Sequence, residues 1–274
     1  MSDHVTQPSL DTLLKTLHLP TFRACYSEMS RLALSEGLTY EQFLWHLSER
    51  ECTERFAHKT QKLLRESKLP LEKTWANFDR DRLPLRLKQQ TSSLLDGTFL
   101  DRRENILAFG NPGSGKTHLL CALSQELVRR GRRILYRPCS LLVQDLLTAK
   151  RDLTLSRYLK HLALYEGLLI DDIGYVQQSR EEMEVLFTLL AERYERGSVM
   201  ITSNLPFSGW EQVFKDPMTT AAAIDRLVHH SVILELNLTS YRMTAAKAVL
   251  APRPSDEGYP SSEGLEETNT GEVI

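Results

Sequence analysis

The segment that most restricts the fold is a loop of eight residues in the middle of the chain, Gly110-Asn111-Pro112-Gly113-Ser114-Gly115-Lys116-Thr117. Its spacing is GxxxxGK followed by Ser or Thr, and an apolar segment, Ile106 to Phe109, comes just before it. An amphipathic segment with leucines at positions 119, 120, 123 and 127 follows. A strand, a glycine-rich turn and a helix in this order direct backbone N–H groups and the positive end of the helix toward a phosphate group. A chance glycine-rich turn would not require both flanking elements, so the pattern predicts a phosphate-binding loop.

The polar residues of this loop have expected roles. We expect the ammonium group of Lys116 to reach the terminal phosphates of a nucleoside triphosphate, and the Thr117 hydroxyl to ligate Mg2+. The residues from Gly110 through His118 are expected to line the nucleotide site together. The sequence therefore predicts binding of a nucleoside triphosphate with Mg2+.

Downstream of the loop, short apolar runs alternate with longer amphipathic ones, an order typical of an α/β fold with a mainly parallel sheet. One amphipathic run, residues 179–196, repeats its apolar residues at helical spacing and can cover one face of a sheet. That helical face comprises Met183, Leu186, Phe187, Leu190 and Tyr194. We predict a three-layer P-loop fold around a five-stranded sheet. The expected strands are Ile106 to Phe109, Ile134 to Tyr136, Leu168 to Asp171, Val199 to Thr202 and Val232 to Leu236.

The N-terminal part of the chain has a helical pattern. Residues Thr39 to Gln42 have the form of a capping box, with a hydroxyl at the cap and an amide three residues later. Before them, Pro20 and Gly37 bracket a second segment with helical spacing. We predict a small all-α domain over residues 1–70, an α/β nucleotide-binding domain over 71–250, and an acidic, disordered tail over 251–274 that is rich in Pro, Gly, Ser and Glu.

Two adjacent carboxylates end the third expected strand, in the segment Leu168-Leu169-Ile170-Asp171-Asp172. Such a strand can lie beside the strand that precedes the loop and present Asp171 to the magnesium ion. Asp172 is placed to orient or deprotonate an attacking water molecule. A second carboxylate that only caps the next turn is the alternative.

Three further features follow later strands and helices. Asn204 follows the fourth expected strand, at the sheet edge that faces the nucleotide. There it would hold the attacking water molecule or contact the γ-phosphate. The alternative is that Asn204 only closes an Asx turn. Arg226 follows an alanine-rich helical stretch. It could neutralise transition-state charge at another subunit's nucleotide, although a lone helix arginine more often forms a surface salt bridge. His229 and His230 lack metal-ligand spacing to a cysteine or carboxylate, which favours a structural role.

The formal net charge of −2 hides an uneven distribution of charge. Residues 251–274 hold one Arg and six acidic residues, so the rest of the chain is basic, and residues 50–88 hold 11 Lys or Arg against 6 Asp or Glu. Further basic groups recur at Arg129-Arg130, Arg132-Arg133, Lys150-Arg151 and 157–161. Spread over one face of an oligomer, these groups would form a track for DNA phosphates. Alternatively, they are solvated helix ends.

Composition excludes several classes of protein. With 41% hydrophobic and 26% charged residues, the chain is typical of soluble globular proteins. No apolar run approaches the roughly 18 residues that a membrane span needs, and the N-terminus has no secretory signal pattern. The four cysteines, Cys25, Cys52, Cys121 and Cys139, form no CxxC pair and are expected to be buried free thiols. These observations favour a reducing cytoplasm and give no sign of a zinc site.

Several longer phrases resemble one family closely. They are residues 101–107 before the loop, Asp171-Asp172-Ile173-Gly174-Tyr175, residues 192–196, residues 202–207 with Trp210, and residues 225–230. These phrases are similar to those of the IstB-like ATP-binding proteins, AAA+ helper ATPases that are encoded beside the transposase in a class of bacterial insertion sequences. The resemblance extends from Tyr40 to Arg242.

The resemblance implies a helical N-terminal domain and an AAA+ module. It implies that the chain binds duplex DNA with little sequence preference, assembles on it as a homo-oligomer in an ATP-dependent way, and stimulates a partner transposase while helping to choose the target. It also implies roles for single residues, and for Arg226 it favours the role at another subunit's nucleotide over a surface salt bridge. Those roles are Lys116 and Thr117 as the Walker A pair, Asp171 and Asp172 as the Walker B pair, Asn204 as the sensor, and Arg226 as the arginine finger.

Two other functions share some of these motifs. A DnaC-type helicase loader would act on a replicative helicase in place of a transposase. A small-molecule kinase uses the same phosphate loop, but a sensor asparagine and a finger arginine argue for an oligomeric ATPase. A separate helical lid with a second sensor arginine is not evident in the sequence, and Arg242 is a candidate substitute for that arginine.

Overall fold

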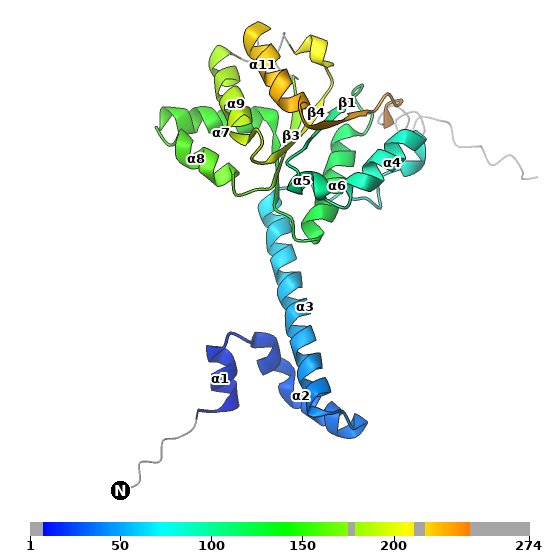
Figure 1. Ribbon diagram of the computed structural model, residues 1–274, viewed down its shortest axis with the longest axis vertical. Helices are drawn as coiled ribbons and strands as arrows, with labels where there is room; N and C mark the ends of the chain where they lie inside the picture. The colour runs from blue at the N-terminus through cyan, green and yellow to red at the C-terminus, as the bar shows by residue number, and fades with distance from the viewer. Residues whose placement is uncertain (1–7, 175–178, 211–216, 242–274) are drawn as a thin grey trace, which may run out of the picture.

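The computed structural model describes residues 8–174, 179–210 and 217–241. Figure 1 shows a body of helices around a sheet, and a long helix that projects from this body and carries two shorter helices. In chain order the elements are α1 (Leu10–Thr16), α2 (Pro20–Glu36), α3 (Tyr40–Ser67), η1 (Arg80–Arg82), α4 (Leu85–Leu94), α5 (Thr98–Asp101), β1 (Asn105–Phe109), α6 (Lys116–Arg129), β2 (Ile134–Pro138), α7 (Cys139–Arg151), α8 (Leu155–Leu162), β3 (Gly167–Ile173), α9 (Arg180–Arg193), β4 (Ser198–Ser203), η2 (Phe207–Gly209), α11 (Pro217–Val228) and β5 (Ser231–Glu235).

The five strands form one parallel sheet in the order β2-β3-β4-β1-β5, which confirms the predicted sheet. One expectation about neighbouring strands is wrong. The strand that ends in the two carboxylates, β3, does not lie beside β1, because β4 is inserted between them. Met200 of β4 pairs with Ile106 of β1 on one side and with Leu169 of β3 on the other. The carboxyl ends of β1, β4 and β3 therefore follow one another along the same edge.

Helices cover both faces of the sheet because its central strands are apolar on both faces. Side chains alternate between the faces along a strand, so that Leu168 and Ile170 of β3 enter one core and Leu169 the other. Helices α7, α8, α9 and α11 pack on the first face. Helices α4, α5 and α6 pack on the second, together with the end of α3. This arrangement is the predicted three-layer fold.

The helix predicted over residues 179–196 is α9. A capping box closes its first turn: the Ser179 hydroxyl accepts the Glu182 N–H, and the Glu182 carboxylate accepts the Ser179 N–H. Met183, Leu186 and Leu190 of the predicted apolar face are buried against the sheet and α7.

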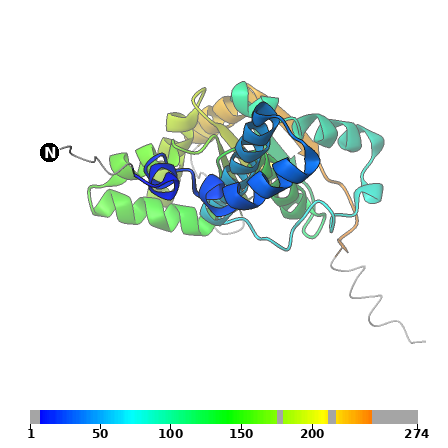
Figure 2. The ribbon, with the colours of Figure 1, turned by 90° about the horizontal axis from the view of Figure 1, so that it is seen from below.

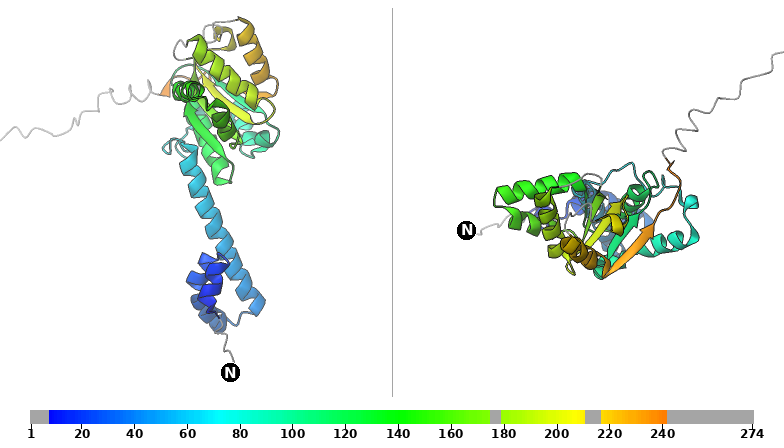
Figure 3. Two further views of the ribbon diagram at one scale, coloured as in Figure 1. Left: turned by 90° about the vertical axis from the view of Figure 1, so that its left-hand side faces the viewer. Right: turned by 90° about the horizontal axis from the view of Figure 1, so that it is seen from above.

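Three helices precede the α/β body. The capping box predicted at the start of α3 is present: the Gln42 N–H donates to Thr39 Oγ1 at 3.2 Å, and the Thr39 N–H donates to Gln42 Oε1 at 2.9 Å. Helix α2 lies between Pro20 and Gly37 as predicted, and Gly37 ends it with a left-handed φ of 65°. Helices α1 and α2 form a hairpin that packs on the start of α3 (Figure 1). Figure 3 shows α3 as a column between this hairpin and the body, and Figure 2 shows the same hairpin from below.

A buried carboxylate joins α2 to α3. Glu51 Oε2 accepts the backbone N–H groups of Thr21 (2.8 Å) and Phe22 (3.2 Å) in the first turn of α2, where the cap residue Leu19 offers no side-chain acceptor. Arg55 Nε donates to Glu51 Oε1 at 2.6 Å. Burial opposes ionisation of Glu51, but these hydrogen bonds outweigh it and hold the pKa of Glu51 below its ordinary value of 4.5.

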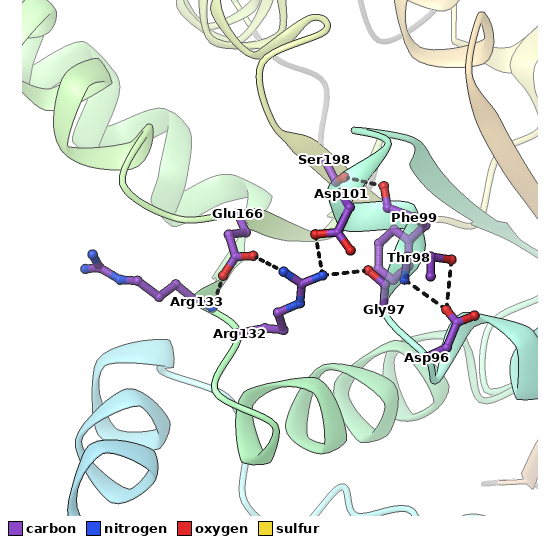
Figure 4. A network of polar contacts seen from close by, with 9 residues as sticks. All are labelled: Asp96, Gly97, Thr98, Phe99, Asp101, Arg132, Arg133, Glu166 and Ser198. Carbon is purple, nitrogen blue, oxygen red and sulfur yellow. Dashed lines mark hydrogen bonds and ion pairs between the residues drawn. The ribbon is translucent and has the colours of Figure 1, made fainter. Parts of the chain in front are cut away.

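A polar network joins the amino ends of three strands (Figure 4). Arg132, before β2, donates to Asp101 at 2.6 Å and to Glu166 at 2.7 Å. Glu166 also accepts the Arg133 N–H at 2.9 Å. The hydrogen bond to Asp101 is the main cause that raises the pKa of Arg132. Because Asp101 and Glu166 stand just before β1 and β3, the network aligns these strands at the edge opposite the phosphate loop.

Cysteine burial agrees with the prediction at three of four positions. Cys25, Cys121 and Cys139 are buried, whereas Cys52 is exposed because no other element covers the middle of α3. Within the described ranges, no helix combines the length and the apolar character that crossing a bilayer requires. Arg242 and the acidic tail predicted over residues 251–274 lie outside the described residues.

Candidate functional site

The predicted loop connects β1 to α6, and Lys116 is the first residue of α6. The Lys116 side chain is buried, with 5% of its surface exposed. Its Nζ donates to the carbonyl groups of Gly110 (2.8 Å) and Asn111 (2.9 Å) within the loop. It also donates to Asn204 Oδ1, after β4, at 2.7 Å. One ammonium group therefore joins the loop to the end of a neighbouring strand.

Asp171, near the end of β3, accepts hydrogen bonds from three hydroxyl groups. Thr117 Oγ1 and Thr202 Oγ1 donate to Asp171 Oδ1 at 2.7 Å and 2.6 Å. The Tyr136 hydroxyl donates to Oδ2 at 3.0 Å. Burial and the adjacent charge of Asp171 raise the pKa of Tyr136, so this hydroxyl keeps its proton. The two residues predicted to hold Mg2+, Thr117 and Asp171, are thus in direct contact.

The end of β3 is irregular at the second carboxylate. The pairing of β3 with β4 shifts register between Ile170 and Ile173, and Asp172 has a left-handed φ of 66°. Such irregularities re-aim side chains at functional edges of sheets. The Asp172 N–H donates to Thr202 Oγ1 at 2.8 Å, and Asp172 Oδ1 accepts from Asn204 Nδ2 at 2.9 Å. The Asp172 side chain therefore contacts the end of β4.

Asn204 uses both ends of its amide. Its oxygen accepts from Lys116 and its nitrogen donates to Asp172, so that one side chain bridges the loop and the acidic pair. In the alternative role, an Asx turn, the Asn204 side chain would bind the backbone about two residues further along the chain. The two contacts described here are instead with side chains distant in the sequence.

Gly110 lies against the chain that follows β5. A Cβ atom at this position would lie 2.3 Å from the Leu236 carbonyl oxygen, and the φ of 149° is rarely adopted by residues with a side chain. The Leu236 N–H donates to the Phe109 carbonyl at 2.7 Å, and the Tyr241 N–H donates to the Gly113 carbonyl at 3.0 Å. Only glycine therefore fits where the loop leaves β1.

His118, the last residue of the predicted nucleotide site, faces an aromatic pair. Its Nε2 lies 3.1 Å from the Thr74 carbonyl oxygen. The ring centroids of His118 and Phe78 are 5.3 Å apart, and Phe78 in turn stacks on Trp75 at 6.2 Å. The segment between α3 and α4 thus packs beside the start of α6.

Arg226 lies apart from these residues. It is near the C-terminal end of α11, where its guanidinium stands 5.0 Å from the centroid of the Phe187 ring and Nη1 donates to the Ala222 carbonyl at 3.1 Å. No ion pair between described residues includes it. The structure therefore gathers Lys116, Thr117, Asp171, Asp172 and Asn204 and does not add Arg226 to them.

The gathered residues fit a phosphate group and a small, hard cation. Ser114 Oγ, in the loop, is buried and has no hydrogen-bond partner among the described residues, as a loop shaped around a ligand oxygen would leave it. The hydroxyl oxygen of Thr117 and the carboxylate oxygens of Asp171 are ligands of the type that Mg2+ prefers. Both features support the predicted site for ATP with Mg2+.

Comparison with known sequences decides the family. Residues 12–248 match the family described as IstB-like ATP binding protein. The chain belongs to this family. An insertion-sequence ATP-binding protein of Sinorhizobium fredii is 39% identical to it, over 88% of this chain and 82% of the relative. The ATP-binding protein of insertion sequence IS5376 from Geobacillus stearothermophilus is 36% identical, over 83% of this chain and 90% of the relative.

A solved structure supports the fold of this IstB-like protein. The crystal structure of the DnaC helicase loader has a TM-score of 0.52 to it, covering 60% of this chain and 97% of that chain at 15% identity. At this identity the likeness concerns the fold alone, and it confirms the AAA+ P-loop architecture.

Sequence reasoning assigns no role to two residues that contact Asp171 in this IstB-like fold. Thr202 is the next-to-last residue of β4, and Tyr136 is the middle residue of β2. These two strands flank β3. A hydroxyl group near the carboxyl end of a strand beside the acidic strand is the signal that would have found them. The strand order is needed to use that signal.

Proposed function

We propose that this chain is an ATP-dependent helper ATPase that assembles on duplex DNA and stimulates a partner transposase. The observation that carries the proposal is the set of contacts at the carboxyl edge of the sheet, where Asn204 binds both Lys116 and Asp172, and Thr117 binds Asp171. Family membership supports ATP as the nucleotide and an insertion sequence as the genetic setting.

Each gathered residue has a role in the proposed hydrolysis. Lys116 neutralises charge on the terminal phosphates, and Thr117 and Asp171 hold Mg2+, which when bound supplies further positive charge at the phosphoryl group. Asp172 orients an attacking water molecule and takes its proton. Asn204 positions the Asp172 carboxylate through its Nδ2 donor.

The proposed finger role of Arg226 requires a second copy of the chain. Within one protomer its contacts are with Phe187 and Ala222, in the layer formed by α9 and α11. In an oligomer its guanidinium would lie beside the nucleotide of the next protomer and neutralise transition-state charge. Loss of the γ-phosphate contacts would then loosen the boundary between protomers, so that the nucleotide state controls assembly.

Part of the basic surface is available for DNA. Arg132 and Lys150 are engaged in ion pairs with acidic residues of this chain. Arg151, at the end of α7, and Arg157 and Lys160, on α8, are exposed and take part in no ion pair between described residues. These three side chains are the proposed phosphate contacts, and counterion release would make the affinity for DNA fall steeply with salt.

A transposase is the proposed partner in preference to a helicase. The relatives at 39% and 36% identity carry insertion-sequence names, whereas the DnaC helicase loader shares the fold at 15% identity. A pull-down with a transposase of an insertion sequence from the same host, against a replicative helicase from that host, separates the two partners.

Assembly is tested by size-exclusion chromatography with light scattering. Wild type and Lys116→Ala are compared with and without a duplex of about 50 base pairs, in ATP with Mg2+ or in ADP, at two salt concentrations. We expect large complexes only for wild type with both ATP and DNA. Lys15→Ala, which changes an exposed lysine of α1, is the matched control and should behave as wild type. A monomer in every condition would overturn the proposal and leave the small-molecule kinase.

The shared site is tested by mixing two inactive variants. Arg226→Ala keeps an intact nucleotide site, and Asp172→Asn keeps an intact finger. In mixed oligomers, some boundaries combine the site of the first variant with the finger of the second, so phosphate release should recover in the mixture. No recovery, with both variants still assembling, would contradict a finger that acts on the neighbouring protomer.

A further inference from the structure

The structure brings a carboxylate to the two histidines that follow α11. Glu195, His229 and His230 are exposed, and each offers a ligand atom that lies within 4.8 Å of the other two. They are the one such group of three His, Cys, Asp or Glu side chains within the part of the chain that the structure describes. Glu195 follows α9, and the histidines link α11 to β5, so the group forms only in the folded chain. The structural role favoured by sequence spacing alone overlooks this carboxylate.

The backbone at these positions is fixed by contacts with the start of β1. The Asn105 N–H donates to the His230 carbonyl at 2.7 Å, and Arg103 Nη1 donates to the Glu195 carbonyl at 2.6 Å. Glu195 has a left-handed φ of 56°. The Asn105 side chain is buried and donates to the Leu227 carbonyl at 3.0 Å, which anchors the end of α11. The two loops that carry the three side chains are thus held by one strand end.

A tyrosine orients one of the imidazole rings. The Tyr194 hydroxyl lies 3.0 Å from His229 Nδ1, and the His229 and His230 ring centroids are 4.1 Å apart. With Nδ1–H donating to the hydroxyl, the lone pair of His229 is on Nε2. A hydrogen bond to the second ring nitrogen is the usual way in which a protein fixes the tautomer of a metal-ligating histidine.

We infer that Glu195, His229 and His230 bind a divalent transition-metal ion, with Zn2+ as the expected occupant. Two imidazole nitrogens and one carboxylate oxygen are a donor set that suits Zn2+, and three protein ligands leave one position for water. Ligands about 2.0–2.1 Å from a tetrahedral ion lie about 3.3 Å from one another. Rotation of exposed side chains closes the remaining separation, because the backbone of both loops is already in place.

The bound ion would join the ends of α9 and α11, three residues after Arg226. It would therefore hold the helix end that carries the proposed finger. This consequence rests on the proposed function, whereas metal binding itself does not.

The test is a titration with Zn2+ by calorimetry and with Co2+ by visible absorption, in excess Mg2+, without nucleotide or DNA, on protein that carries no polyhistidine tag. For wild type we expect one ion per chain and the ligand-field bands of a bound Co2+. His230→Ala and Glu195→Gln should lower the affinity more than about tenfold and remove those bands. Tyr194→Phe should weaken binding about tenfold but keep the bands, because it removes only the group that orients a ligand.

The matched control is His58→Ala, which removes an exposed histidine from α3 and should bind the ions as wild type does. Circular dichroism of each variant checks that it is folded. Equal affinity in wild type, His230→Ala and Glu195→Gln would overturn the inference. So would Co2+ bands that disappear in Asp171→Asn but persist in Glu195→Gln, because the ion would then occupy the phosphate-loop site. Neither result depends on whether the chain hydrolyses ATP.

Discussion

Lys116 Nζ and Asn204 Oδ1 are 2.7 Å apart, although Lys116 begins α6, Asn204 follows β4, and 88 positions separate them in the chain. The other end of the same amide holds Asp172 at 2.9 Å. Because β4 lies between β1 and β3, a residue at its end is the one that can reach both the phosphate loop and the acidic pair.

Replacing this amide by a carboxylate should uncouple binding from turnover. In Asn204→Asp the donor to Asp172 is lost and a second negative charge faces that carboxylate, so we expect the rate of ATP hydrolysis to fall more than about tenfold, or about 1.4 kcal/mol in activation free energy. Phosphate release and binding of a fluorescent ATP analogue measure the two steps. Asn77→Asp, in the linker before α4, is the control and should change neither. An unchanged rate in Asn204→Asp would remove its positioning role.

Thr202 should matter although it belongs to no expected ligand set. Its hydroxyl donates to Asp171 and accepts from the Asp172 backbone, so Thr202→Val removes two hydrogen bonds with little change in volume. We expect turnover to fall about tenfold, equivalent to about 1.4 kcal/mol. Thr188→Val, on the exposed face of α9, controls for loss of a threonine hydroxyl. Equal rates for the two variants would show that the Thr202 contacts do not affect the acidic pair.

Gly110→Ala should destabilise the loop and β5 together. The added Cβ would meet the Leu236 backbone at 2.3 Å, so the strand end has to shift, and we expect the free energy of unfolding to fall by about 2–4 kcal/mol. Gly37→Ala is the control, since φ is 65° there but open space surrounds the position. It should cost about 1 kcal/mol. Denaturant unfolding of both variants separates the close approach from the backbone strain, and similar losses would contradict the close approach.

The stability contributed by Glu51 should disappear in acid. Its pKa is lowered in the folded chain, so the contribution is complete above the ordinary pKa of 4.5 and is lost as the pH falls through the folded value. At pH 7 we expect Glu51→Gln to lower the free energy of unfolding by about 1–2 kcal/mol. Below 4.5 the difference from wild type should shrink. The control Glu54→Gln changes an exposed residue of the same helix and should leave the free energy of unfolding unchanged. If Glu51→Gln still unfolded more easily than wild type in acid, the shape of the Glu51 side chain, and not its charge, would be what stabilises the fold.

Thiol reagents should distinguish one cysteine. Cys52 is exposed, whereas burial raises the pKa of Cys121 to about 12, which leaves almost no reactive thiolate at pH 8. Brief labelling of the native protein, followed by mass spectrometry, should modify Cys52 alone, and labelling after unfolding should modify all four cysteines. Cys52→Ser should leave native protein unlabelled. Modification of Cys121 in the native protein would show that α6 opens readily.

The features predicted well are those set by local chemistry. The capping box at Thr39 and the phosphate loop depend on residues within a few positions of one another, and both are present. The apolar runs located all five strands. The signal is strongest for β1, β3 and β4, because central strands that are buried on both faces have few polar residues. These patterns do not depend on how the elements are ordered in the sheet.

The features missed are those that depend on pairing between distant segments. The position of β4 between β1 and β3 has no local signature, so the contacts of Thr202 and Tyr136 with Asp171 could not be derived. The same holds for Glu195 beside the histidines, because that group depends on where α9 and α11 end. Long-range register decides all of these contacts.

Helix α3 also fixes the direction in which the hairpin of α1 and α2 faces relative to the body. Its 28 residues run without a break, and residues 52–59 are all exposed between the part that carries the hairpin and the part that enters the body. Each residue of a helix turns the chain by about 100° and advances it by about 1.5 Å. The hairpin is therefore set at one azimuth about the axis of α3, and its distance from the sheet and the direction it faces change together with every residue gained or lost in this bare stretch. Relatives with a longer or shorter α3 would keep the hairpin facing the same direction only if the number of residues gained or lost is close to a whole number of helical turns.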